Sequence, residues 1–140
     1  MKPIIIACIL LLATSLFATG QIKMNRSLNN SKKEKMDTEI LKNTIVKKAI
    51  DALQAADRQK WLSAFTTEAE LYDDGNKMDF KTFFDIGHER FISIDKVENN
   101  GLDVYGKFHS DTWGDFKTYF RFHINGNEKI KRLDVGQANY

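Results

Sequence analysis

Cysteine is almost absent from this chain. The 140 residues include one cysteine, Cys8, which lies close to the N-terminus. A chain with one cysteine forms no internal disulfide, so we expect its fold to be stabilised by the packing of apolar side chains. Cys8 also falls in a segment that we predict to be removed, which excludes thiol chemistry in the mature protein.

A charge excess of either sign is also missing. The chain has 21 Lys and Arg residues against 19 Asp and Glu residues, a formal net charge of +2. Basic residues alternate with acidic ones along the part that we expect to fold, whereas a nucleic-acid-binding protein concentrates basic residues on one face. We therefore expect no nucleic-acid partner.

The common sequence motifs of metal, nucleotide and nucleophilic sites are absent too. The three histidines show neither HxxxH nor HxH spacing, so a metal site is unsupported. No glycine-rich phosphate loop and no serine-centred nucleophile elbow occurs. We predict neither a metal nor an organic cofactor.

One long apolar run opens the chain. Lys2 precedes the run from Ile4 to Phe17, and the small residues Ala18-Thr19-Gly20 are typical of a signal peptidase site. The run is short for a membrane span, which needs about 20 apolar residues. We predict that residues 1–20 are a signal peptide without lipidation, which makes the protein periplasmic or secreted and leaves no membrane segment; an uncleaved anchor is the alternative.

The remaining sequence divides into a linker and one domain. Residues 21–37 are rich in Asn, Ser and Lys and lack apolar periodicity, which predicts a flexible linker. Residues 38–140 are enough for a single domain with one core. Apolar spacing and capping residues predict helices before any sheet. The expected elements are a helix from Asp37 or Thr38 to about Ala56, a short helix after Asp57, a strand over Ala69–Asp73, and a helix from Asp79 to Gly87.

Two Asn-Gly dipeptides predict how the second half folds. Asn100-Gly101 and Asn125-Gly126 each separate apolar runs, and Asn-Gly favours the type I′ turn of a two-residue hairpin. The first hairpin then places Asp95 opposite Gly106, and the second places Thr118 opposite Leu133. The predicted class is α+β, a cone-shaped fold with three N-terminal helices packed on a curved antiparallel meander sheet.

The predicted register points several polar and aromatic side chains into the concave face. They are Ser93, Asp95, Phe108, Thr118 and Phe120. A carboxylate facing an aromatic cavity is desolvated, which raises its pKa and suits it to general acid-base catalysis, so Asp95 is the first catalytic candidate. The alternative is that Asp95 lies where the sheet curls outward and is solvated or caps a backbone group.

Several segments resemble the nuclear transport factor 2-like (SnoaL-like) superfamily. They are the helix Ala49–Ala56, the segment Trp61–Phe65, the turn Tyr72-Asp73-Asp74-Gly75, and two stretches similar to an uncharacterised bacterial SnoaL-like branch, His88–Asp95 and Leu133–Ala138. The resemblance implies a cone whose interior holds a small apolar molecule. Whether the protein is an enzyme stays open; the resemblance implies an isomerase-, cyclase- or dehydratase-type general acid-base enzyme without a metal, although the first helix lacks the tyrosine of ketosteroid isomerase.

Other candidate residues each have two interpretations. His88 lines the mouth of the cone, as a second catalytic candidate, or bonds a loop carbonyl. Asp74 forms an acid-base pair with His88, or bonds its own turn. Trp61, Phe65 and Phe84 line the pocket, or pack in the core as aromatic residues at helical spacing commonly do.

The outer sheet face mixes apolar and charged residues, among them Ile92, Tyr105, Tyr119 and Arg121. Such a surface suits a homodimer contact, and it also suits a solvated face with scattered apolar residues.

Two functions are consistent with these observations. The first is an exported small-molecule-binding protein with an apolar conical pocket and weak general acid-base activity. The alternative is a non-catalytic dimeric scaffold or interaction module.

Overall fold

The computed structural model describes residues 36–84 and 88–140. The predicted signal peptide, nearly all of the predicted linker, and Gly87 lie outside the described residues. Within these ranges, no helix has the length and apolar character needed to cross a membrane.

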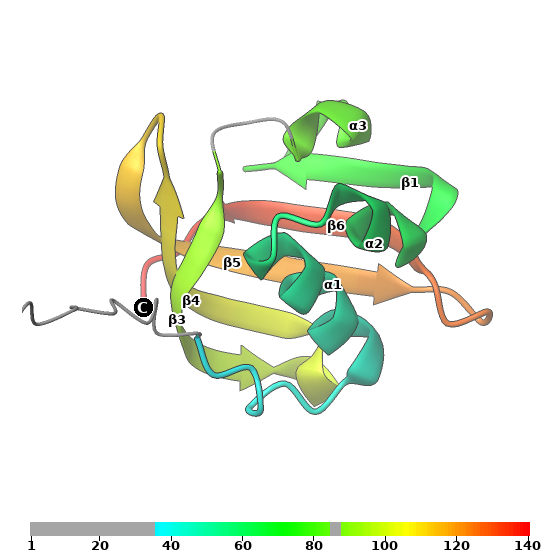
Figure 1. The fold of residues 1–140 in the computed structure, drawn as a ribbon, viewed down its shortest axis with the longest axis horizontal. Helices are drawn as coiled ribbons and strands as arrows, with labels where there is room; N and C mark the ends of the chain where they lie inside the picture. The colour runs from blue at the N-terminus through cyan, green and yellow to red at the C-terminus, as the bar shows by residue number, and fades with distance from the viewer. Residues whose placement is uncertain (1–35, 85–87) are drawn as a thin grey trace, which may run out of the picture. The chain divides into compact units, whose positions relative to one another are not determined.

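Helices lie over one face of a curved sheet, so the predicted α+β class is confirmed. Figure 1 shows α1 and α2 crossing the sheet, with α3 beside β1. The helices are α1 (Thr44–Gln54), α2 (Arg58–Ser63) and α3 (Phe80–Phe83), with a 3-10 turn at Asn99–Gly101. The strands are β1 (Phe65–Asp73), β2 (Asn76–Met78), β3 (Arg90–Glu98), β4 (Asp103–Ser110), β5 (Gly114–Ile124) and β6 (Ile130–Gln137).

The sheet order is β2-β1-β6-β5-β4-β3, which contains the predicted meander β3–β6. The sheet is nevertheless mixed rather than wholly antiparallel, because β1 pairs with β6 in parallel, with Leu71 beside Leu133. β1 is also longer than the brief strand predicted at Ala69–Asp73. This parallel pair brings the end of β1, with its acidic residues, beside the end of β6.

Helix α1 begins later than the sequence predicts. The prediction started the helix at Asp37 or Thr38, but Asn43 is its N-cap, and its side-chain oxygen accepts hydrogen bonds from the backbone N–H groups of Ile45 and Val46. The Thr38 hydroxyl instead donates to Asp51 at 2.8 Å. The predicted caps Asp57 and Asp79 are confirmed, since each carboxylate accepts a backbone N–H in the first turn of its helix.

The core lies between these helices and the concave face of the sheet. Along β5 buried residues alternate with exposed ones, so Thr118, Phe120 and Phe122 face the helices. Trp61 of α2 is fully buried and contacts Phe65 and the three phenylalanines of the α3 region, Phe80, Phe83 and Phe84. The part of the core next to α2 and α3 is therefore built mainly from aromatic side chains.

The predicted register of the second hairpin is wrong, although most of its side chains lie on the predicted faces. Thr118 pairs with Gln137 rather than Leu133, four residues further along β6. The turn is longer than two residues, because the backbone N–H of Asn125 donates to the carbonyl of Lys129 at 2.8 Å. Alternation along a strand has a period of two, so an even slip keeps Thr118, Phe120 and Leu133 on their predicted face. Ile130 is an exception: alternation predicts it on the outer face, but it follows the register shift at His123 and Ile124 and is buried in the core.

The first hairpin contains two irregularities that change faces. Val97 lies opposite Val104, as predicted, but the register shifts between Ile94 and Lys96 and again between Phe91 and Ser93. Ile94, not Asp95, therefore lies opposite Gly106, and Ile94 packs against the core. Each β-bulge adds one residue to β3 and reverses the alternation across it.

Gly106 is required by this bulged pairing, which gives a first prediction. A Cβ at position 106 would lie 2.0 Å from the backbone carbonyl oxygen of Ser93, a contact that only movement of β3 can relieve. We expect Gly106→Ala to lower the free energy of unfolding by about 3 kcal/mol, measured by urea denaturation. Gly126→Ala is the control, because nothing lies within 4 Å of a Cβ there. Equal effects of both substitutions would contradict this account of the bulge.

Candidate functional site

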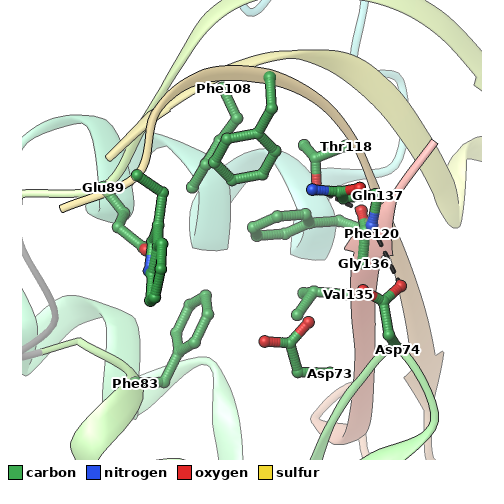
Figure 2. A pocket seen from close by; sticks show the side chains of 12 residues that line it. Asp73, Asp74, Phe83, Glu89, Phe108, Thr118, Phe120, Val135, Gly136 and Gln137 are labelled. Carbon is green, nitrogen blue, oxygen red and sulfur yellow. Dashed lines mark hydrogen bonds between the residues drawn. The ribbon is translucent and has the colours of Figure 1, made fainter. Parts of the chain in front are cut away.

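A cavity of about 350 Å³ opens between α3, the β4–β5 hairpin and the ends of β1 and β6. This volume lies within the range of small-molecule sites. Its walls combine aromatic and polar residues, several of which are labelled in Figure 2. The lining residues are Asp73, Asp74, Phe83, Glu89, Phe108, Trp113, Phe116, Thr118, Phe120, Val135, Gly136 and Gln137.

Three of the seven predicted pocket residues line this cavity, and Trp61, Phe65, Phe84 and Ser93 do not. Phe108, Thr118 and Phe120 are on its wall, as their inward face predicted. The Thr118 hydroxyl donates to the carbonyl of Gly136 at 2.8 Å. Trp61 and Phe65 instead are buried in the core, the alternative that the sequence left open. Phe84 borders a second cavity, which Phe83 also lines.

Asp95 and Ser93 lie on the outer face, so the prediction that they point into the cone is wrong. The Asp95 carboxylate accepts hydrogen bonds from the Ser93 hydroxyl and from the Tyr140 hydroxyl, both at 2.7 Å. Tyr140 in turn packs edge-on against Tyr105 of the outer face. These two hydrogen bonds, Tyr140 first, lower the pKa of Asp95, the opposite of the expected desolvation. The β3 bulges cause Asp95 and Ser93 to point outward, because they reverse the alternation of side chains along the strand.

Glu89 is the carboxylate that the cavity desolvates. It stands one residue before β3 and lines the cavity together with Phe83 and Trp113. Burial raises its pKa from 4.5 to about 7, and the negative charge of Asp73 acts in the same direction, against a hydrogen bond from Ser110. A carboxyl group with this pKa exchanges a proton near neutral pH.

Two neighbouring aspartates at the end of β1 have different roles. Figure 2 shows the Asp73 carboxylate pointing into the cavity, whereas Asp74 turns toward the backbone of Gln137. Burial, and then the charge of Asp74, raises the pKa of Asp73. One Asp74 carboxylate oxygen accepts the backbone N–H of Gln137 at 3.1 Å, which ties the turn after β1 to β6. Asp74 therefore lines the cavity mainly as a structural bridge between strands.

His88 lies elsewhere than the predicted pair requires. It borders the second cavity, of about 380 Å³, while Asp74 borders the first. Its imidazole Nδ1 lies 3.0 Å from a carboxylate oxygen of Asp111, and the other oxygen of Asp111 lies 3.0 Å from Nε2 of His109. His88 is thus bonded to a carboxylate rather than to a loop carbonyl, and it contributes to holding the β4–β5 hairpin.

Sequence reasoning missed Glu89 and treated Asp73 only as a turn residue. A signal for Glu89 existed, because it stands two residues before the buried Phe91 and so shares the inner face of β3. Gln54 of α1 holds this strand, since its side chain accepts the N–H of Phe91 at 2.7 Å and donates to the carbonyl of Phe91 at 2.9 Å. The Asp73 signal is absent from the sequence, because it depends on the parallel pairing of β1 with β6.

The chemical groups that the site offers to a bound molecule are mainly carboxyl groups. Glu89 and Asp73 present two carboxyl groups with raised pKa values to a partly apolar space. Across residues 36–84 and 88–140, no group of three or more His, Cys, Asp or Glu side chains is arranged to hold a metal ion. The arrangement can therefore bind a small molecule and exchange a proton with it.

The domain has the nuclear transport factor 2-like fold, which confirms the resemblance seen in the sequence. It is similar to an NTF2-like protein of unknown function from Cytophaga hutchinsonii, with a TM-score of 0.56, 12% identity, and coverage of 67% of this chain and 87% of that one. It is also similar to a SnoaL-like protein of unknown function from Burkholderia thailandensis, with a TM-score of 0.53, 13% identity, and coverage of 73% and 98%.

A third similar structure is that of the Orange Carotenoid Protein of an Anabaena (Nostoc) species, which binds canthaxanthin. The TM-score is 0.53 and the identity 17%, over 66% of this chain and 35% of that chain. No family model matches the chain, and no curated protein matches it in sequence. The fold is thus one that holds small molecules in some of its members, and the particular function has to be argued from the site.

Proposed function

We propose that this protein binds a small, mainly apolar molecule in the cavity between α3 and the concave sheet. The observation that carries the proposal is the cavity of about 350 Å³, walled by phenylalanines and bordered by carboxyl groups. A pocket with apolar walls and a few convergent polar groups is the usual form of a small-molecule site. The carotenoid-binding structural neighbour supports the same class of function.

Glu89 is the group that we propose to exchange a proton with the bound molecule. It meets the first requirement of a general acid or base, a pKa of about 7, and it borders the cavity. Any reaction at this site would be of the isomerase, cyclase or dehydratase kind, in which a proton moves on a carbon skeleton without a metal. Binding is the primary function proposed, and proton transfer is its extension.

Export is part of the proposal and rests on the sequence of residues 1–20. Intact mass measurement of protein isolated from the medium or periplasm of its host would test it. A mature N-terminus at Gln21 is expected, and a full-length chain in the cytoplasmic fraction would contradict it.

The binding proposal is tested with tryptophol, a neutral indole alcohol, followed by amide chemical shifts in the NMR spectrum of the isotopically labelled protein. We expect saturable shifts centred on Thr118, Val135 and Gly136, which line the cavity. Asp95→Asn is the control variant, because Asp95 lies on the outer face, and it should leave the shifts and the affinity unchanged. Shifts that are absent, or scattered over the surface, would overturn the proposal.

A further inference from the structure

The cavity is acidic and aromatic, without a basic side chain among its described lining residues. Three carboxylates line it, from Asp73, Asp74 and Glu89, together with five aromatic side chains. The aromatic residues are Phe83, Phe108, Trp113, Phe116 and Phe120. This composition differs from a simple apolar pocket, because both kinds of group attract positive charge.

The negative charge at the cavity has no counter-charge within the described part of the chain. No Lys, Arg or His side chain there forms an ion pair with Asp73, Asp74 or Glu89, although such pairs are frequent elsewhere in the domain. The charges that act on Glu89 and Asp73 are those of other carboxylates. A half-buried charge normally has a partner, so a positively charged ligand would complete this site.

Trp113 supplies an aromatic face at the entrance. Trp113 is 73% exposed, more than any other large apolar residue among those described, and it lines both the main cavity and a smaller one of about 180 Å³. Ser110 holds the loop that carries it, because its hydroxyl oxygen accepts the backbone N–H groups of Thr112 and Trp113 at 3.3 and 3.4 Å. An indole beside two carboxylates is a suitable surface for an organic ammonium group.

We propose that the ligand of this cavity is an organic amine, a cation with an apolar body that the phenylalanines enclose and an ammonium group that Glu89, Asp73 and Trp113 bind. The inference rests on the proposed small-molecule function and specifies its ligand class. The same carboxylates repel anionic ligands. A neutral ligand of equal shape gains the apolar contacts and loses the charge interaction.

Three matched indole probes test the ligand class: tryptamine is a cation, tryptophol is its neutral alcohol counterpart, and indolepropionate is an anion. Affinities are measured at pH 8 by NMR titration of the full domain. We expect tryptamine to bind about tenfold more tightly than tryptophol, and indolepropionate to bind most weakly. Trp113→Ala should reduce tryptamine affinity more than tryptophol affinity, because the cation–π contact is lost for tryptamine alone.

The pH dependence provides a second readout. The charged groups around Glu89 are Asp73 and Asp74 across the main cavity, and His88, Arg90 and Asp111 around the second one. Arg90 donates to the backbone carbonyl of His88 at 3.2 Å. Ionisation of Glu89 as the pH rises from 5.5 to 8 adds a negative charge to the cavity, so tryptamine binding should strengthen several-fold. Glu89→Gln should remove this increase. Tryptophol binding should stay within about twofold over the same pH range.

The outcomes separate this inference from the function on which it depends. Preferential binding of tryptamine that Glu89→Gln and Asp73→Asn both weaken would support it. Equal or tighter binding of tryptophol in the cavity would overturn the amine class and leave small-molecule binding standing. Absence of binding by all three probes would overturn both. Asp95→Asn should change none of these affinities, since its carboxylate lies on the outer face.

Discussion

Glu89→Gln should raise the free energy of unfolding at pH 8 and raise it far less at pH 5. Burial raises the pKa of Glu89 from 4.5 to about 7, so the folded protein must hold a poorly solvated charge above that pH. Glutamine has nearly the same shape and no charge. A pKa difference of this size corresponds to at most about 3 kcal/mol, of which solvent at the cavity entrance removes a part.

The sign follows from proton linkage. Between pH 4.5 and about 7 the folded state binds the Glu89 proton more tightly than the unfolded state does. The resulting stabilisation is fully present below the unfolded pKa and is lost as the pH rises through the folded pKa. The raised pKa of His109, which its bonds to Asp115 and Asp111 cause, has the same sign in an overlapping range. Comparison of wild type with Glu89→Gln isolates Glu89, because His109 is common to both.

The measurement is urea denaturation followed by circular dichroism at several pH values from 5 to 8.5. Glu68→Gln is the matched control, since Glu68 is an exposed glutamate on β1 that does not line the cavity, and its substitution should change the free energy of unfolding little. A Glu89→Gln variant that is less stable than wild type at pH 8 would mean that the Glu89 carboxylate is stabilised in the fold. That result would remove the basis for its role in proton exchange.

The contrast between Glu89 and Asp95 shows what the sequence could predict. Alternation of polar and apolar residues identified the inner face of β4 and β5 correctly, so Phe108, Thr118 and Phe120 were placed on the cavity wall. The same reasoning failed along β3, where two bulges reverse the alternation. A bulge depends on contacts between strands, such as the close approach of Gly106 to Ser93, and these contacts have no local sequence signature.

Other parts of the site depend on contacts distant in sequence. The parallel pairing of β1 with β6 places Asp73 beside Val135, and that pairing joins segments separated by the rest of the sheet. Helix caps show the limits of local rules in a different way. Asp57 and Asp79 cap their helices as predicted. The Thr38 hydroxyl instead donates a hydrogen bond to Asp51, and Asn43 is the cap of α1. Local patterns predicted the order of three helices and the β3–β6 meander but not the bounds of α1 and β1 or the strand β2, and tertiary contacts decided which carboxylates meet.

Trp61→Ala should be among the most destabilising single substitutions, with a loss of about 3 to 5 kcal/mol in the free energy of unfolding. Trp61 is fully buried, and its ring centroid lies 4.7 Å from that of Phe65 and 5.9 Å from that of Phe83. Phe83 forms a wall of the cavity, so the space left by the indole should also loosen that wall. We therefore expect weaker tryptophol binding even under conditions where the variant is folded.

Trp61→Phe separates packing from hydrogen bonding at the same position. The indole nitrogen of Trp61 is buried without a hydrogen-bond partner among the described residues, so replacing the indole by a phenyl ring removes no hydrogen bond and relieves an unsatisfied donor. We expect Trp61→Phe to cost markedly less than Trp61→Ala and to retain most of the tryptophol affinity. Equal losses for the two variants would show that a phenyl ring cannot replace the indole in its contacts with Phe65 and Phe83, and would contradict this account.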